Sequence, residues 1–117
     1  MAQEIYKIEA IIRPNRLEAV QESLQDLDIH SITVIEAKGI ARNRTMGHAF
    51  RGSQYANNLA PRIKIEIFVL AEQVALVSEA IQEAAFTGEV GDGKLFVLPV
   101  TDALRIRTGE KGETALS

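Results

Sequence analysis

Two short segments near the C-terminus carry the residue types best suited to bind an anion. Residues 87–94 read Thr-Gly-Glu-Val-Gly-Asp-Gly-Lys, and residues 105–110 read Arg-Ile-Arg-Thr-Gly-Glu. Glycines allow tight turns, and successive N–H groups in such a turn can surround an anion. Lys94 adds a positive charge, and Arg105 and Arg107 would project from the same side of an extended segment. Because a guanidinium matches two phosphate oxygens at once, the combination predicts a phosphate-binding site.

The first segment comes close to the Walker A motif of P-loop enzymes. Gly88, Gly93 and Lys94 fit that motif, but Leu95 stands where it needs Ser or Thr to hold magnesium. Residues 94–100 then have the pattern of a strand, whereas a P-loop opens a helix. The sequence therefore argues against a P-loop NTPase. Two alternatives stay open. One is a plain glycine-rich turn with arginines on a solvated edge, and the other is a slow ATPase, although no general base stands out.

The composition is that of one globular domain over residues 1–117. The chain is 46% hydrophobic and 25% charged, with a net charge of -3. It has no apolar run of about 18 residues and no signal-peptide core, so we expect a cytoplasmic protein. The acidic balance argues against nucleic-acid binding. Because cysteine is absent and His30 and His48 are far apart, no protein metal site is expected.

The hydrophobic periodicity predicts two strand–helix–strand halves. Alternation predicts strands at about 5–13 and 63–69 and, with β-branched residues, at 32–37; a fourth is expected at 94–100. Apolar residues at helical spacing predict helices at about 15–27 and 72–86. Residues 40–61 have no useful period, and the tail at 102–117 is mostly polar. This order predicts an α+β ferredoxin-like βαββαβ sandwich, an antiparallel sheet with two helices on one face.

The sheet face away from the helices also carries apolar residues. Ile5, Ile11, Phe68 and Phe96 fall on that face by the period of two. An exposed apolar patch usually marks an interaction site, so we expect a homo-oligomer in which another subunit covers this face. The alternative is that these residues pack beneath the long loop.

Taken together, these segments resemble the PII-type nitrogen-regulatory signal-transduction proteins. The resemblance runs without a gap from about Lys7 to Glu110, most of the chain. The glycine loop and the Arg-x-Arg-Thr-Gly-Glu segment are highly specific as a pair. The other matching stretches are residues 7–14, Thr33-Val34, Lys38-Gly39, Arg51-Gly52 with Tyr55, and residues 61–66.

The resemblance implies a regulator rather than an enzyme. Such proteins are ferredoxin-like homotrimers that bind ATP or ADP in clefts between subunits, and many bind 2-oxoglutarate beside Mg-ATP. They report energy and carbon/nitrogen status by reshaping a long loop that docks on enzymes, transporters or transcription factors. The implied loop here is 41–59, and a transporter partner would recruit the protein to the membrane. No permanent cofactor is implied.

The implied nucleotide-binding residues are Thr33, Thr87, Gly91, Asp92, Gly93, Lys94, Arg105 and Arg107. Asp92 also reads as a turn-shaping residue, because it lies between two glycines.

The sequence departs from the family pattern around the long loop. Asn43 replaces a glutamine that helps hold magnesium and 2-oxoglutarate, and Arg62 replaces a lysine that pairs with the 2-oxoglutarate carboxylate. Arg51 matches an arginine that enters the channel of ammonium transporters, and Tyr55 matches a tyrosine that some members nucleotidylate. An unmodified loop tyrosine is the favoured reading of Tyr55. The departures leave open a divergent sensor of ADP or AMP. In it another small anion, such as bicarbonate, replaces 2-oxoglutarate, and the partner is a transporter other than one for ammonium.

Overall fold

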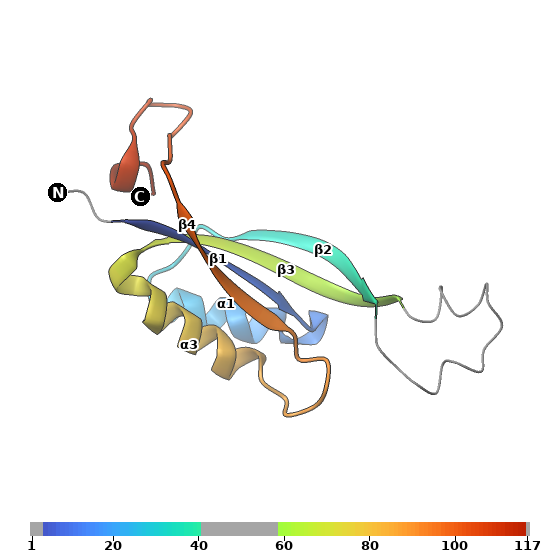
Figure 1. Ribbon diagram of the computed structural model, residues 1–117. Coiled ribbons are helices and arrows are strands. Elements are labelled where there is room, and N and C mark those ends of the chain that lie inside the picture. The colour runs from blue at the N-terminus through green and yellow to red at the C-terminus, as the bar shows by residue number, and fades with distance from the viewer. Residues whose placement is uncertain (1–3, 41–58, 117) are drawn as a thin grey trace.

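The computed structural model describes residues 4–40 and 59–116, so the predictions for Asn43, Arg51 and Tyr55 lie outside the described residues. Of the loop implied at 41–59, only Leu59 is described, and it opens strand β3. Its strands form one antiparallel sheet in the order β2-β3-β1-β4, with α1 and α3 on one face (Figure 1). The predicted α+β ferredoxin-like sandwich is confirmed. The elements are β1 (Ile5–Ile12), η1 (Pro14–Arg16), α1 (Leu17–Asp26), β2 (Thr33–Ile40), β3 (Leu59–Leu70), η3 (Ala71–Gln73), α3 (Val74–Ala85), β4 (Lys94–Val100) and η4 (Gly112–Leu116).

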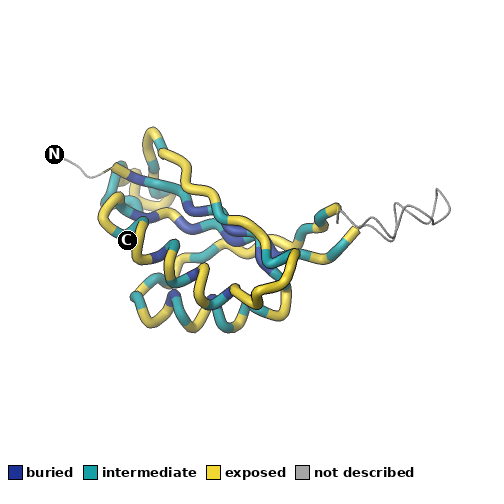
Figure 2. Tube along the Cα trace, turned by 60° about the horizontal axis from the view of Figure 1, so that its bottom comes forward, coloured by how far each residue is buried: buried dark blue, intermediate teal, exposed yellow. Residues whose placement is uncertain are grey.

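The core lies between the sheet and the two helices. On β1 the buried side chains alternate, and Ile8 pairs across the sheet with Ile67 on β3 and with Val97 on β4. Val20 on α1 and Ile81 on α3 are buried at helical spacing opposite them. Figure 2 shows the buried positions along the strands and the inner sides of the helices, with exposed positions outside. No helix among residues 4–40 and 59–116 is long and apolar enough to cross a membrane.

Arg16 joins the two helices. Its Nε and Nη2 donate to the carbonyl oxygen of Ala84, at 2.9 Å and 2.7 Å, in the last turn of α3. The last carbonyls of a helix have no partner within the helix and carry partial negative charge. The guanidinium therefore satisfies a free carbonyl and holds the end of α3 against the start of α1.

One predicted boundary was wrong, and one short helix was not predicted. The strand predicted at 63–69 is longer, because β3 begins at Leu59 and passes through Pro61. A proline is tolerated at a free strand edge, and β1 pairs with β3 only as far as Ile63, so Pro61 has β2 alone as its neighbour. The polar tail at 102–117 contains a short helix, η4.

The face away from the helices combines charge with apolar surface. Lys7 and Lys64 each bridge Glu9 and Glu66, with N–O distances of 3.0 Å to 3.3 Å. The lysine hydrogen bonds hold the pKa of both carboxyl groups below its ordinary value. The two cations and two anions cancel. We call these four residues the charge quartet.

Apolar side chains flank the charge quartet as the sequence predicted. Phe68 and Phe96 are 45% and 49% exposed on this face. Ile5 also belongs to it, but it is already buried within the chain, at the end of the sheet where the C-terminal segment lies (Figure 1). The exposed part of the face therefore centres on the two phenylalanines and the quartet.

Candidate functional site

The loop between α3 and β4 is fitted closely to the sheet. Gly88, Gly91 and Gly93 have φ angles of 89°, 106° and 102°, which favour glycine. A Cβ atom at Gly93 would stand 1.7 Å from the carbonyl oxygen of Ile11 on β1. No other residue fits there without moving the strand or the loop.

Asp92 organises this loop from the inside. Its carboxylate accepts hydrogen bonds from the Thr87 hydroxyl, from the backbone N–H of Thr87 at 2.8 Å and of Gly88 at 2.9 Å, and from Arg13 Nε at 3.0 Å. The Thr87 hydrogen bonds, followed by that of Arg13, hold the pKa of Asp92 far below its ordinary value. The carboxylate thus shapes the loop and stays ionised, in line with its reading as a turn residue.

Two arginines stand beside the loop. Arg13 Nη2 donates to the carbonyl oxygen of Val90 at 2.8 Å, and Arg62 Nη1 donates to that of Pro61 at 2.8 Å. A methyl group added at Gly91 would lie 3.1 Å from Arg13 Nη2 and 3.2 Å from Arg62 Nη2. The guanidiniums converge on Gly91 and form a cationic corner suited to a small anion. Sequence reasoning assigned no role to Arg13; its place just after a strand and before Pro14 was the available signal.

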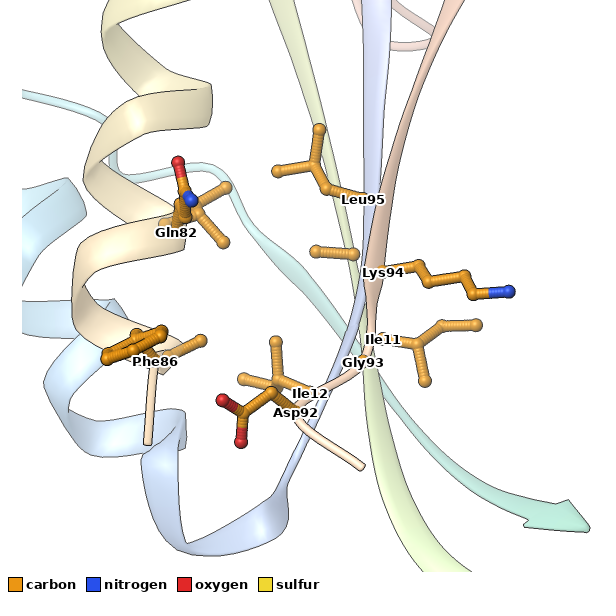
Figure 3. Close-up of a pocket in the computed structure, with 11 residues that line it drawn as sticks. Ile11, Ile12, Gln82, Phe86, Asp92, Gly93, Lys94 and Leu95 are labelled. Atoms are coloured by element: carbon orange, nitrogen blue, oxygen red, sulfur yellow. The ribbon is translucent and has the colours of Figure 1, made fainter. Parts of the chain in front are cut away.

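Lys94 and Asp92 point to different sides of the loop. Figure 3 shows Asp92 beside a hollow under α3, with Gln82 and Phe86 across from it, while the Lys94 side chain extends away from that hollow. The hollow has a volume of about 220 Å³ and is lined mainly by apolar side chains. Lys94 opens β4 and pairs with Ile11 in the register, so it belongs to the sheet face that carries the charge quartet.

Arg105 and Arg107 lie in a hook formed by residues 102–116. The hook is closed by a bridge between Leu104 and Lys111, and residues 106–108 form a turn within it. The segment is therefore not extended as the sequence argument assumed, because the Thr-Gly-Glu that follows favours the turn. Arg105 Nη1 donates to Glu110 Oε1 at 2.8 Å, whereas Arg107 is exposed on the turn.

A single chain keeps the predicted site residues apart. The glycine loop precedes β4 and the hook follows it, so they lie at opposite ends of this strand (Figure 1). Its 7 residues span roughly 20 Å at about 3.3 Å each. Thr33 opens β2, at the other edge of the sheet from β4. Lys94 is thus separated from Arg107 by the length of a strand and from Thr33 by the width of the sheet. The structure instead gathers Thr87, Gly91, Asp92, Gly93, Lys94 and Arg62 at one end, which we call the loop half. Arg105 and Arg107 lie in the hook, and Thr33 lies across the sheet on β2, level with Phe96 in the register. We call these three residues the hook half.

The hook half includes an aromatic ring that the sequence flagged only as part of the apolar face. Phe68 lies on the same sheet face as Thr33 and lines a hollow of about 380 Å³ beside the turn at 28–31 and η4. Its ring is 45% exposed. An exposed ring beside an open hollow can stack on a planar base. Within the described segments, no group of three or more His, Cys, Asp or Glu side chains could hold a metal ion.

Comparison with known proteins gives one consistent result. Residues 5–110 match the family model "Nitrogen regulatory protein P-II". The nitrogen regulatory protein P-II of Azospirillum brasilense is 48% identical over 110 residues, which cover 94% of this chain and 98% of that protein. Its counterpart in Pasteurella multocida is 47% identical over the same shares. The crystal structure of Arabidopsis thaliana PII bound to citrate has a TM-score of 0.80 and 41% identity, covering 97% of this chain and 92% of that one.

Proposed function

The chain belongs to the nitrogen regulatory P-II family of signal-transduction proteins, and we propose that it is a homotrimeric sensor that binds adenine nucleotides between subunits. Members of the family are regulators, not enzymes, and they form homotrimers that act on partner enzymes or transporters. In this proposal, nucleotide binding controls a partner protein through residues 41–59.

One observation carries the proposal. The glycine loop and the hook each hold cations suited to phosphate, yet they lie at opposite ends of β4, which is about 20 Å long. A nucleotide cannot use Lys94 and Arg107 of the same chain. Two neighbouring chains, with the loop half of one facing the hook half of the other, would bring the cations onto one ligand.

Each half supplies a different part of the site. In the loop half, the glycine N–H groups and Lys94 would bind phosphate oxygens. In the hook half, Arg105 and Arg107 would neutralise the phosphate chain, and Thr33 and Phe68 would lie near the base or ribose. Because each ligand touches two chains, its binding energy can bias how the subunits pack and, through β2 and β3, the loop that joins them.

A second candidate concerns the signal. The cationic corner of Arg13 and Arg62 at Gly91 fits a small anion, and it could take 2-oxoglutarate beside Mg-ATP or a smaller ion such as bicarbonate. The shorter amide side chain of Asn43 and the guanidinium of Arg62, which stands in place of a lysine, favour an altered effector. The protein would then be a sensor of ADP or AMP that acts on a transporter other than one for ammonium.

Calorimetric titration of the purified protein tests both candidates. ATP, ADP and AMP are each titrated with and without magnesium plus 2-oxoglutarate or bicarbonate. ATP binding tightened by 2-oxoglutarate supports the conventional sensor. A preference for ADP or AMP, indifferent to 2-oxoglutarate, supports the divergent one. No binding of any of the three would contradict the proposed function.

A further inference from the structure

Arg105 already has an anionic partner within its own chain. Its Nη1 donates to Glu110 Oε1 at 2.8 Å, and its Nη2 donates to the carbonyl oxygen of Thr114 at 3.0 Å. The Thr108 hydroxyl donates to the same Glu110 oxygen at 2.8 Å. A carboxylate oxygen that accepts from a guanidinium and a hydroxyl makes the contacts that a bound phosphate oxygen would make there.

The backbone of the hook holds Glu110 in this place. The N–H of Arg105 donates to the carbonyl oxygen of Glu110 at 2.8 Å, and that of Gly109 donates to the carbonyl oxygen of Arg105 at 2.7 Å. The Glu110 side chain is 45% exposed and that of Arg105 is 26% exposed. A ligand arriving from solvent can therefore reach the pair.

We propose that Glu110 is an internal competitor of the nucleotide phosphate for Arg105, and so a residue that sets affinity and release at the site. The inference rests on the proposed function. Binding exchanges the Glu110 carboxylate for a phosphate oxygen on the guanidinium, and no covalent bond changes. Arg107, on the same turn, has no hydrogen bond or ion pair within residues 4–40 and 59–116, so it meets the ligand without this exchange.

The charge of Glu110 can be removed while its length and accepting oxygen are kept. In calorimetric titrations with ATP, Glu110→Gln should tighten binding about two- to fivefold, the range for a partly exposed ion pair. Glu113→Gln is the matched control, because it removes the same charge from the hook without touching Arg105. It should leave the affinity for ATP nearly unchanged.

A double-mutant cycle separates competition from general electrostatics. The gain from Glu110→Gln should vanish when Arg105 is replaced by alanine. Unchanged or weaker binding in the Glu110→Gln variant would overturn the inference alone, provided that the wild type binds ATP and Arg107→Ala weakens it. A gain that persists without Arg105, or that Glu113→Gln reproduces, would also overturn it. A wild type that binds no nucleotide would overturn the proposed function and this inference together.

Discussion

At Gly93 the loop touches the carbonyl oxygen of Ile11, and this contact fixes where Lys94 enters the sheet. Gly93→Ala should lower the thermal midpoint and weaken ATP binding, because its Cβ would force loop and strand apart. Gly109→Ala is the control, since that glycine also has a positive φ but no atom within 4 Å of the added methyl group. Equal effects of the two substitutions would mean that backbone strain alone, without the contact to β1, explains the loss. Thermal unfolding measures the thermal midpoint of each variant, and calorimetry measures its affinity for ATP.

Asp92 makes the loop sensitive to acid. Because its pKa is lowered in the folded protein, the ionised carboxylate stabilises the fold above the ordinary carboxyl range, and this contribution is lost as the pH falls through the lowered pKa. Wild type should therefore melt above the Asp92→Asn variant at neutral pH, and the difference should shrink in strong acid. Glu89→Gln, which removes a carboxylate from the same loop but none of the Asp92 hydrogen bonds, is the control. A difference between wild type and Asp92→Asn that is constant with pH would contradict this account.

At the scale of elements, the sequence predicted what periodicity controls and missed what pairing controls. The two helices and four strands follow from apolar spacing. The length of β3 does not, because whether Pro61 interrupts a strand depends on how far β1 extends beside it. The hook was missed for the same reason: its bridge joins Leu104 to Lys111 without any periodic signal. The glycine loop was predicted from its residue types, whereas Arg13 reaches it from a distant element.

Arg16 provides a test of how the helices are held. Arg16→Ala removes two hydrogen bonds and a positive charge from the C-terminal end of α3, so it should lower the free energy of unfolding by about 1 kcal/mol. Denaturant unfolding measures this loss. Arg16→Lys keeps the positive charge but lacks the two guanidinium N–H donors, so it should recover part of the lost free energy of unfolding. If Arg16→Ala were as stable as wild type, the contact to Ala84 would contribute nothing.

At the scale of the whole molecule, the helix-free face and the divided site call for the same assembly. Phe96→Glu puts an anion beside Glu9 on the face proposed to be covered in the trimer, so it should yield monomers by light scattering. Leu76→Glu makes the same change on the outer side of α3, where the side chain is 57% exposed, and should leave the trimer intact. A trimer that survives Phe96→Glu would show that this face is not the interface.

The central claim is that one nucleotide site takes Lys94 from one chain and Arg107 from the next. Lys94→Ala and Arg107→Ala homotrimers should each lose about 1.5–3 kcal/mol of nucleotide binding free energy, the range for hydrogen bonds to charged groups.

The decisive measurement is ATP binding to mixed trimers of the two variants, co-expressed with different tags and purified through both. In a cyclic mixed trimer, one cleft joins an intact loop half to an intact hook half, so we predict one site per trimer with wild-type affinity. If both residues served a ligand within one chain, no mixed trimer would regain a site, and the absence of tight binding would contradict the account.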